Sequence, residues 1–210
     1  QHSLQVANCA GAAARSIGAD DVLVRAAALY HDIGKSVNPL CFVENEQQGE
    51  DYHKSLDAKE SAKAIIRHVT DGLALAEKYK LPRVLREFIT THHGTTRTAY
   101  FYNTYVNNGG NPEDVADFMY PGPRPTTREQ VILMISDALE AASRTLKDKT
   151  PNGISELVDR ILLGKFQEQQ FNDSDITIKE LTIMSETLKE YIQQVYHARV
   201  VYPKARKTKK

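Results

Sequence analysis

Seven residues of the types that bind metal ions lie next to apolar, helix-like stretches of the chain. They are His2, His31, Asp32, His68, His92, His93 and Asp137. Asp137 lies inside an apolar run, and the pair His31-Asp32 ends another just before Gly34, where burying an imidazole and a carboxylate is costly unless something compensates. A metal ion compensates for that cost, and this number of His and Asp ligands suffices for two ions. The sequence therefore predicts a two-metal centre.

The chemistry of such a centre follows from its donor atoms and its charge. Nitrogen and oxygen ligands without a thiolate suit Fe, Mn, Zn or Co. Two divalent ions outweigh the charges of Asp32 and Asp137, so the site attracts a hydroxide and a phosphate anion together. We expect Asp32 to bridge the ions and a bridging hydroxide to attack phosphorus, with His31, Asp32 and Lys35 as the catalytic residues.

Candidate substrate contacts follow these ligands along the chain. Lys35 is one helical turn past His31-Asp32, and Arg144 is seven residues after Asp137, so either cation could neutralise a phosphate oxygen. The aromatic cluster at 100–105 could stack on a nucleobase. Surface ion pairs for the two cations, and core packing for the aromatic side chains, are the alternatives. The full predicted set is Lys35, Thr95, Tyr100, Tyr120 and Arg144.

Apolar spacing close to the helical repeat predicts an all-α fold, and no stretch alternates clearly enough to predict a strand. The expected helices cover residues 2–17, 20–30, 57–68, 73–79, 82–93, 127–146, 154–163 and 178–200. Capping-box spacing predicts two of the starts, at Asp57 with Glu60 and at Thr177 with Glu180. Breaks are expected at 70–72 and 150–153, and residues 98–125 predict a short helix and then a long ordered loop that carries specificity.

The bulk composition bounds the class of protein. The 210 residues fit one domain over 1–200, with the motifs in 2–146, C-terminal helices in 154–200 and a basic, disordered tail at 201–210. Lys+Arg and Asp+Glu are equal at 27 each, so no basic field predicts binding to a nucleic acid polymer. Cys9 and Cys41 lack zinc-ligand spacing and are expected to be buried or free thiols, and His53 and His197 are expected to be solvated. No stretch approaches the length of a membrane span.

The order of these residues resembles the HD phosphohydrolase superfamily. His2, His31-Asp32 within His-Asp-Ile-Gly-Lys, and Asp137 carry that likeness, and His68 with His92-His93 resembles its two-metal phosphodiesterase branch. Four further segments, 42–45, 92–96, 100–102 and 118–125, are similar to the cytoplasmic domain of the seven-transmembrane HD family of bacterial cyclic-di-AMP phosphodiesterases. The likeness runs from His2 to about Leu146.

That resemblance implies an all-helical HD domain that hydrolyses cyclic-di-AMP to the linear dinucleotide pApA with two iron or manganese ions. It implies one ion on His2, His31, Asp32 and Asp137, and the other on Asp32, His68, His92 and His93. Cyclic-di-GMP hydrolases carry Gly-Tyr-Pro after their His pair, so Gly-Thr-Thr at 94–96 favours the adenine dinucleotide. Glu44 and Asn45 are expected to support the ligands or to cap a turn.

The same family implies a parent protein anchored in the bacterial membrane N-terminal to this chain, with the domain on the cytoplasmic face. A first residue other than Met agrees with a longer parent. A homodimer is left open. Two other functions are also left open: an HD nucleotidase or nucleotide phosphohydrolase acting on mononucleotides, and a module that senses cyclic dinucleotides without hydrolysing them. A sensor has no need to keep the His31-Asp32 pair, so the full ligand set favours an enzyme.

Overall fold

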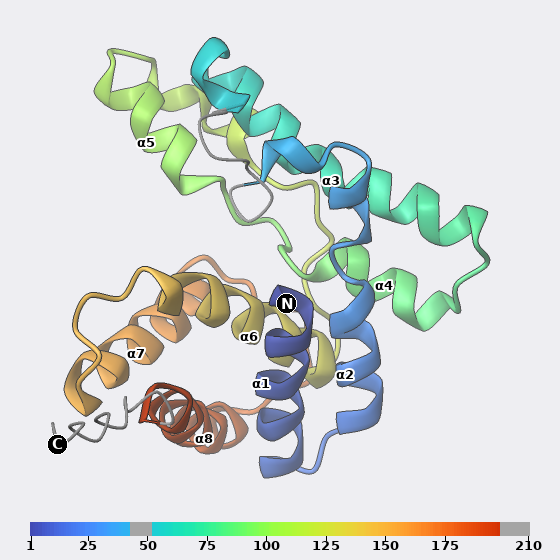
Figure 1. Cartoon of the computed structure of the whole chain (residues 1–210), viewed down its shortest axis with the longest axis vertical. Coiled ribbons are helices and arrows are strands. Elements are labelled where there is room, and N and C mark those ends of the chain that lie inside the picture. The colour runs from blue at the N-terminus through green and yellow to red at the C-terminus, as the bar shows by residue number, and fades with distance from the viewer. Residues whose placement is uncertain (43–51, 198–210) are drawn as a thin grey trace, which may run out of the picture.

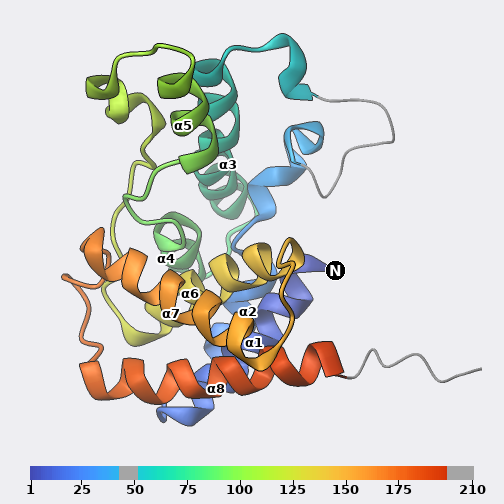
Figure 2. The same ribbon diagram turned by 90° about the vertical axis from the view of Figure 1, so that its left-hand side faces the viewer.

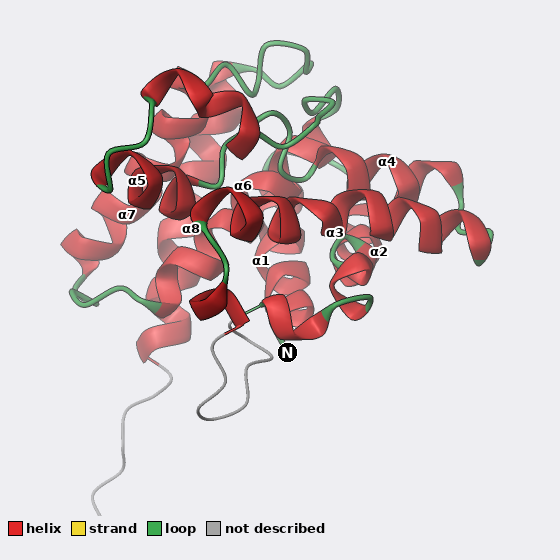
Figure 3. Ribbon diagram, turned by 90° about the horizontal axis from the view of Figure 1, so that it is seen from above, coloured by secondary structure: helices red, strands yellow, loops and turns green. Residues whose placement is uncertain are grey.

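The structure is a computed structural model that describes residues 1–42 and 52–197. Helices joined by loops and turns make up these residues, without any strand, as Figure 3 shows. The only extended pairing among the described residues is an isolated bridge between Arg97 and Met119. The predicted all-α class is therefore confirmed. The elements are α1 His2–Ser16, α2 Asp21–Tyr30, η1 Ile33–Ser36, η2 Pro39–Cys41, η4 Tyr52–Ser55, α3 Ala58–Lys78, α4 Arg83–Thr91, α5 Ala99–Asn107, η5 Pro112–Phe118, α6 Arg128–Arg144, α7 Pro151–Gln167 and α8 Ile178–His197.

The helices form two groups that meet at the middle of the molecule (Figure 1). In one group, α1 packs against α2, α6 and α8, and α7 packs against α6 and α8. In the other group, α3 packs against α5, and α4 joins the two groups through contacts with α2, α3 and α6. Figure 2 shows α8 running across the end of the first group, away from α3 and α5.

The main hydrophobic core lies inside the first group. It includes Ala10 and Ala13 of α1, Ile132 and Leu139 of α6, and the C-terminal residues Ile154, Leu157, Met184 and Leu188. Apolar side chains of α7 and α8 therefore complete the core that α1 and α6 begin. A second cluster joins α1, α2, α4 and α6 through Val6, Ala27, Phe88 and Leu133. These two cores fix the helices that carry the candidate ligands.

Side-chain caps define most of the helix starts that the sequence predicts. Asp20 accepts a hydrogen bond from the Leu23 amide at 2.9 Å, and Thr127 accepts one from the Gln130 amide at 3.2 Å. Both predicted capping boxes, Asp57 with Glu60 and Thr177 with Glu180, are confirmed by reciprocal bonds. Each cap satisfies amides at the helix start that have no partner within the helix.

The predicted break at 70–72 is wrong, because α3 runs through it without interruption from Ala58 to Lys78. Gly72 lies inside this helix at a close approach of the neighbouring backbone. A Cβ on Gly72 would lie 3.0 Å from Cγ2 of Ile89 and 3.3 Å from the amide nitrogen of Gly34. The glycine therefore marks a packing contact, not a turn.

The predicted break before the next helix is present, but it covers residues 145–150 and not 150–153. Thr150 caps α7 by accepting a bond from the Gly153 amide at 3.2 Å, and Pro151 is the first residue of the helix. Proline fits that position because its φ angle suits the helix and the amide it lacks would have no partner there. The helix is correspondingly longer at both ends than residues 154–163.

Residues 98–125 contain a short helix and then an ordered connection, as predicted. The helix is α5, and the connection passes through η5 before returning toward α4. Two backbone bonds hold the return: the Thr98 amide donates to the Phe118 carbonyl, and the Tyr120 amide donates to the Thr96 carbonyl, both at 2.8 Å. This pairing brings Tyr120 beside the residues that follow α4.

Several smaller predictions have mixed outcomes. Cys9 and Cys41 are buried free thiols, as expected. In the part of the chain that the structure describes, no helix has the length and hydropathy needed to cross a bilayer. Residues 43–45, including Glu44 and Asn45, the side chain of His197 and the tail at 201–210 lie outside the described residues.

Candidate metal centre

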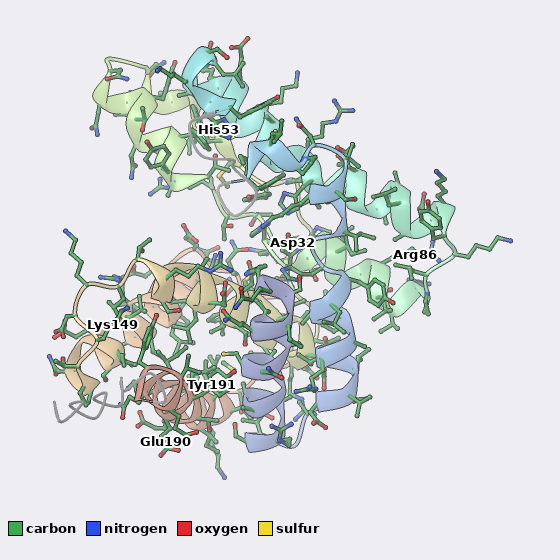
Figure 4. All side chains as sticks on the ribbon, in the orientation of Figure 1. Asp32, His53, Arg86, Lys149, Glu190 and Tyr191 are labelled. Atoms are coloured by element: carbon green, nitrogen blue, oxygen red, sulfur yellow. The ribbon has the colours of Figure 1, made fainter. Side chains whose placement is uncertain are left out.

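The seven predicted ligands come together where the two groups of helices meet, and Figure 4 shows Asp32 at this place. Their donor atoms form two sets, each with all its atoms within 4.8 Å of one another. One set is His2, His31, Asp32 and Asp137, and the other is Asp32, His68, His92 and His93. Asp32 belongs to both sets, as a residue that bridges two ions must.

Helix ends and helix interiors both supply these side chains. His2 begins α1, while His31 and His92 follow the last residues of α2 and α4. His68 and Asp137 lie within α3 and α6. The site therefore depends on five helices from both groups, which explains why its residues are far apart in the sequence.

The two carboxylate oxygens of Asp32 face different histidines. Its Oδ2 atom lies 3.3 Å from Nε2 of His2 and 3.3 Å from Nε2 of His31. Its Oδ1 atom lies 3.4 Å from Nε2 of His68 and 3.7 Å from Nε2 of His92. Each oxygen therefore faces one ligand set.

Three of the histidines are oriented by their own helices. The Nδ1 atoms of His31, His68 and His92 lie 2.8, 2.7 and 2.8 Å from the carbonyl oxygen three residues earlier. A ring that donates its Nδ1 proton to a carbonyl keeps Nε2 as the free donor of an electron pair. In each case, Nε2 is the atom that faces the cluster.

Several buried polar atoms of the cluster make no hydrogen bond within the described residues. They are Nε2 of His2, Nε2 of His31 and both carboxylate oxygens of Asp32. The Nε2 atoms of His68 and His92 face each other at 3.1 Å, although the Nδ1 atom of each ring already faces a backbone carbonyl oxygen. Buried polar groups in proteins are normally hydrogen-bonded or bound to an ion, so this arrangement fits metal ions.

Electrostatics divides the histidines into two kinds. Burial lowers the pKa of His2, but the nearby carboxylates of Asp137, Asp32 and Glu140 outweigh it and raise the pKa to about 11. Burial likewise lowers the pKa of His31, but the nearby carboxylates of Asp32 and Asp137 outweigh it and raise the pKa to about 10. Burial raises the pKa of the Asp32 and Asp137 carboxyl groups, but the imidazoles of His2 and His31 outweigh it and hold both pKa values well below the usual range.

The other three histidines are kept neutral. Burial and the charges of His31 and His68 lower the pKa of His92 to about 3. Burial also lowers the pKa of His68, and burial with neighbouring histidines lowers that of His93. A neutral imidazole is the form that binds a metal ion.

Two of the predicted substrate-binding residues, Lys35 and Tyr120, lie beside the metal ligands. The Lys35 ammonium lies 2.8 Å from Oδ2 of Asp32 and 5.0 Å from the centre of the Phe42 ring. Tyr120 is buried and stacks on His93, with ring centres 4.1 Å apart and planes 22° apart. These two residues therefore lie at the cluster.

Thr95 and Arg144 have intramolecular partners. The Thr95 amide donates to the Gln170 side chain at 3.0 Å, and its hydroxyl accepts a bond from the same amide group at 3.0 Å. Arg144 donates to Oε1 of Glu140, at 2.9 Å from Nε and 2.8 Å from Nη2. Their predicted contact with substrate stays a prediction.

Tyr100 lies away from the ligands, in the wall of a cavity of about 1050 Å³. Residues of α3, α5 and the 3-10 helices line this cavity, including Phe101 and Tyr105 of the predicted stacking cluster. Phe42 lies in the same wall, and its ring centre is 5.7 Å from that of His68. Phe42 therefore contacts both the cavity and a member of the second ligand set.

The predicted solvation of His53 is wrong. This residue belongs to η4, is half-buried and lines the same cavity. Its Nε2 atom lies 2.9 Å from the Cys41 carbonyl oxygen, and its ring centre is 5.0 Å from that of Phe101. The residues on either side of His53 are mostly polar, so the local sequence did not indicate its contacts with Cys41 and Phe101.

Three residues near the cluster were not predicted from the sequence. Glu140 accepts a hydrogen bond from Nδ1 of His2 at 2.5 Å, and Gln170 holds the segment after His93. Burial lowers the pKa of Lys165 on α7, although the charges of Glu168 and Asp137 oppose this shift. The position of Glu140, one turn after Asp137 on a buried helix, was the one available signal.

The fold and the clustered histidines and aspartates define an HD domain. The chain belongs to the HD domain family, whose sequence pattern matches residues 1–142. The resemblance seen in the sequence is thus confirmed. The region beyond residue 142 lies outside that match, although its helices complete the core.

Two of the relatives that the chain resembles over nearly its whole length are bacterial proteins of the same name. The chain is 40% identical over 203 residues to the cyclic-di-AMP phosphodiesterase PgpH of Listeria monocytogenes, covering 96% of this chain and 28% of the relative. It is 37% identical over 206 residues to PgpH of Bacillus subtilis, covering 98% and 29%. The chain therefore spans less than a third of the length of these relatives.

A solved structure extends the comparison to three dimensions. The crystal structure of the L. monocytogenes PgpH HD domain in complex with cyclic-di-AMP superposes with a TM-score of 0.87. The two chains are 39% identical, and the match covers 93% of this chain and 91% of that one. This coverage is larger than that of the HD family pattern, which ends at residue 142.

Proposed function

We propose that this chain is the catalytic domain of a phosphodiesterase that opens cyclic-di-AMP to pApA. The observation that carries the proposal is the pair of four-residue ligand sets that share Asp32. Similarity to a domain solved with cyclic-di-AMP supports the same substrate for this chain.

The residues present fit two divalent ions, iron or manganese. His2, His31, Asp32 and Asp137 would hold one, and Asp32, His68, His92 and His93 the other. When bound, such ions lower the pKa of a shared water and stabilise charge on the phosphate oxygens. Nitrogen and carboxylate donors without a thiolate suit these metals.

The protein's own groups position the substrate. Lys35, at 2.8 Å from Asp32, lies where it can also donate to a phosphate oxygen of the bound dinucleotide. The cavity beside Phe42 has aromatic side chains in its wall that suit a stacked adenine, Tyr100 and Phe101 among them. Tyr120 keeps the His93 ring in place and excludes water from its buried face.

A cyclic dinucleotide fits this arrangement better than a mononucleotide. The cavity is large enough for a base while a phosphate lies at the cluster, and Phe42 in its wall contacts the His68 ring of the second ligand set. The intact His31-Asp32 pair supports turnover over mere sensing. We further propose that the parent protein is anchored in the bacterial membrane, with this domain on the cytoplasmic side, and that the chain can form a homodimer.

The test is a comparison of substrates under single-turnover conditions. The chain is reconstituted with manganese or iron and given cyclic-di-AMP, cyclic-di-GMP, a mononucleotide or a short linear RNA. The proposal expects conversion of cyclic-di-AMP to pApA at least tenfold faster than any of the others. Faster hydrolysis of the mononucleotide would favour a nucleotidase, and tight binding of cyclic-di-AMP without any product would favour a sensor.

A further inference from the structure

His2 is oriented differently from three other histidines of the cluster, His31, His68 and His92. Its Nδ1 atom donates to a carboxylate on another helix, Oε2 of Glu140 at 2.5 Å. The Nδ1 atoms of His31, His68 and His92 instead face neutral backbone carbonyls of their own helices. A carboxylate behind a ligating imidazole fixes the tautomer and raises the basicity of the opposite nitrogen more than a neutral carbonyl does.

Glu140 is itself held from the other side. It is 5% exposed and lies on α6, three residues after Asp137. Its Oε1 atom accepts a hydrogen bond from Nε of Arg144, one turn further along the helix, and lies 2.8 Å from Nη2 of the same guanidinium. Because one oxygen binds Arg144 and the other binds His2, the carboxylate is locked in a single orientation.

The result is an unequal pair of ion sites. The set containing His2 has Asp32, Asp137 and, behind the imidazole, Glu140. The set containing His68, His92 and His93 has Asp32 alone as a carboxylate, and that residue is shared. More negative charge close to an ion strengthens its binding, so the two sites should fill at different metal concentrations.

We propose that Glu140, held by Arg144, is a positioning residue that makes the His2 site the tighter of the two and the first to fill. This inference rests on the proposed two-metal centre. It also gives Arg144 a role that needs no contact with substrate.

The test is a titration of the chelator-treated chain with Mn²⁺, in which bound and free ion are counted by electron paramagnetic resonance. The unmodified chain is expected to show two classes of site. Glu140→Gln should weaken the tighter class about 10- to 100-fold and leave the weaker class unchanged. Glu190→Gln is the matched control, because Glu190 is exposed on α8 and far from Asp32 (Figure 4), and its isotherm should match that of the unmodified chain.

A second variant distinguishes a specific effect on the His2 site from a general loss of structure. Arg144→Gln leaves Glu140 in place and alters a side chain that is 41% exposed, so it should weaken the tighter class by a smaller factor, with an unchanged helical spectrum. Equal weakening of both classes in Glu140→Gln, or an isotherm that matches the unmodified chain, would overturn the inference. Absence of Mn²⁺ binding by the unmodified chain would instead overturn the proposed metal centre itself.

Discussion

Gly34 and Gly72 let the segment that follows the His31-Asp32 pair rest directly on the backbone of α3. A Cβ on Gly34 would lie 1.9 Å from the His68 carbonyl oxygen and 2.5 Å from the Gly72 amide nitrogen. No side chain can occupy that space unless the backbone moves. The close approach brings Asp32 to His68, which belongs to α3, and thereby couples the two ligand sets.

Gly34→Ala should therefore disrupt the cluster. Because the obstructing atoms belong to the backbone, η1 must move away from α3, and we expect a loss of about 1–3 kcal/mol or more in the free energy of unfolding. The variant should also bind less Mn²⁺. Urea unfolding and a metal titration measure the two effects.

Gly164→Ala is the matched control for this substitution. Gly164 lies in α7 with no atom within 4 Å of an added Cβ, so alanine should stabilise the helix by about 0.5–1 kcal/mol. Equal and small effects of both substitutions would contradict the packing argument.

The stability of the chelator-treated chain should pass through a maximum near pH 6.5. The pKa of His2 rises from 6.5 to about 11 on folding, so its contribution is complete below pH 6.5 and is lost as the pH rises toward 11. The pKa of His92 falls from 6.5 to about 3, so the unfolded chain takes up the proton first and stability is lost as the pH falls from 6.5 toward 3. Urea unfolding at pH 4.5, 6.5 and 9 measures both slopes.

Metal should change the alkaline side of this profile. Ions replace the protons on His2 and His31, so their binding strengthens as the pH rises and the decline above pH 6.5 should disappear with saturating Mn²⁺. His2→Gln should likewise lessen that decline in the chelated chain. A stability that keeps rising to pH 9 without metal would contradict the charge assignment of these two histidines.

Gln170 links the C-terminal part of the chain to the His pair. It is 1% exposed and bonds both the amide and the hydroxyl of Thr95, two residues after His93. Gln170→Ala leaves these half-buried groups of Thr95 without a partner and should cost about 1–3 kcal/mol of the free energy of unfolding. Gln167→Ala, at an exposed position at the end of α7, should have almost no effect. The same loss from both variants would show that Gln170 has no special role.

Much of the site could be predicted because its chemistry is expensive to bury. Asp137 inside an apolar helix, and His31-Asp32 at the end of another, signal a compensating ion whatever the fold. Helix starts at Asp20, Asp57 and Thr127 could be predicted for a similar reason, since their side chains satisfy amides only a few residues away.

The remaining features depend on contacts between distant parts of the chain. Gly72 was predicted to mark a break between helices. Its role is to let the backbone of Gly34, which lies 38 positions earlier, come close to α3. The partnership of His2 with Glu140 spans 138 positions, and the spacing of Glu140 from Asp137 places it near the cluster without revealing this partner. His53 was misjudged in the same way, because its burial comes from α5.

The shared position of Asp32 is the central claim, and metal counting combined with single-turnover hydrolysis tests it most directly. Asp32→Ala and Asp137→Ala are purified, reconstituted with Mn²⁺ and compared with the unmodified chain, which is expected to hold two ions and to convert cyclic-di-AMP to pApA. Asp137→Ala should lose one ion, whereas Asp32→Ala, with both ligand sets broken, should lose both ions and at least a thousandfold in rate while its helical spectrum is retained. Two bound ions and near-normal turnover in Asp32→Ala would contradict the account.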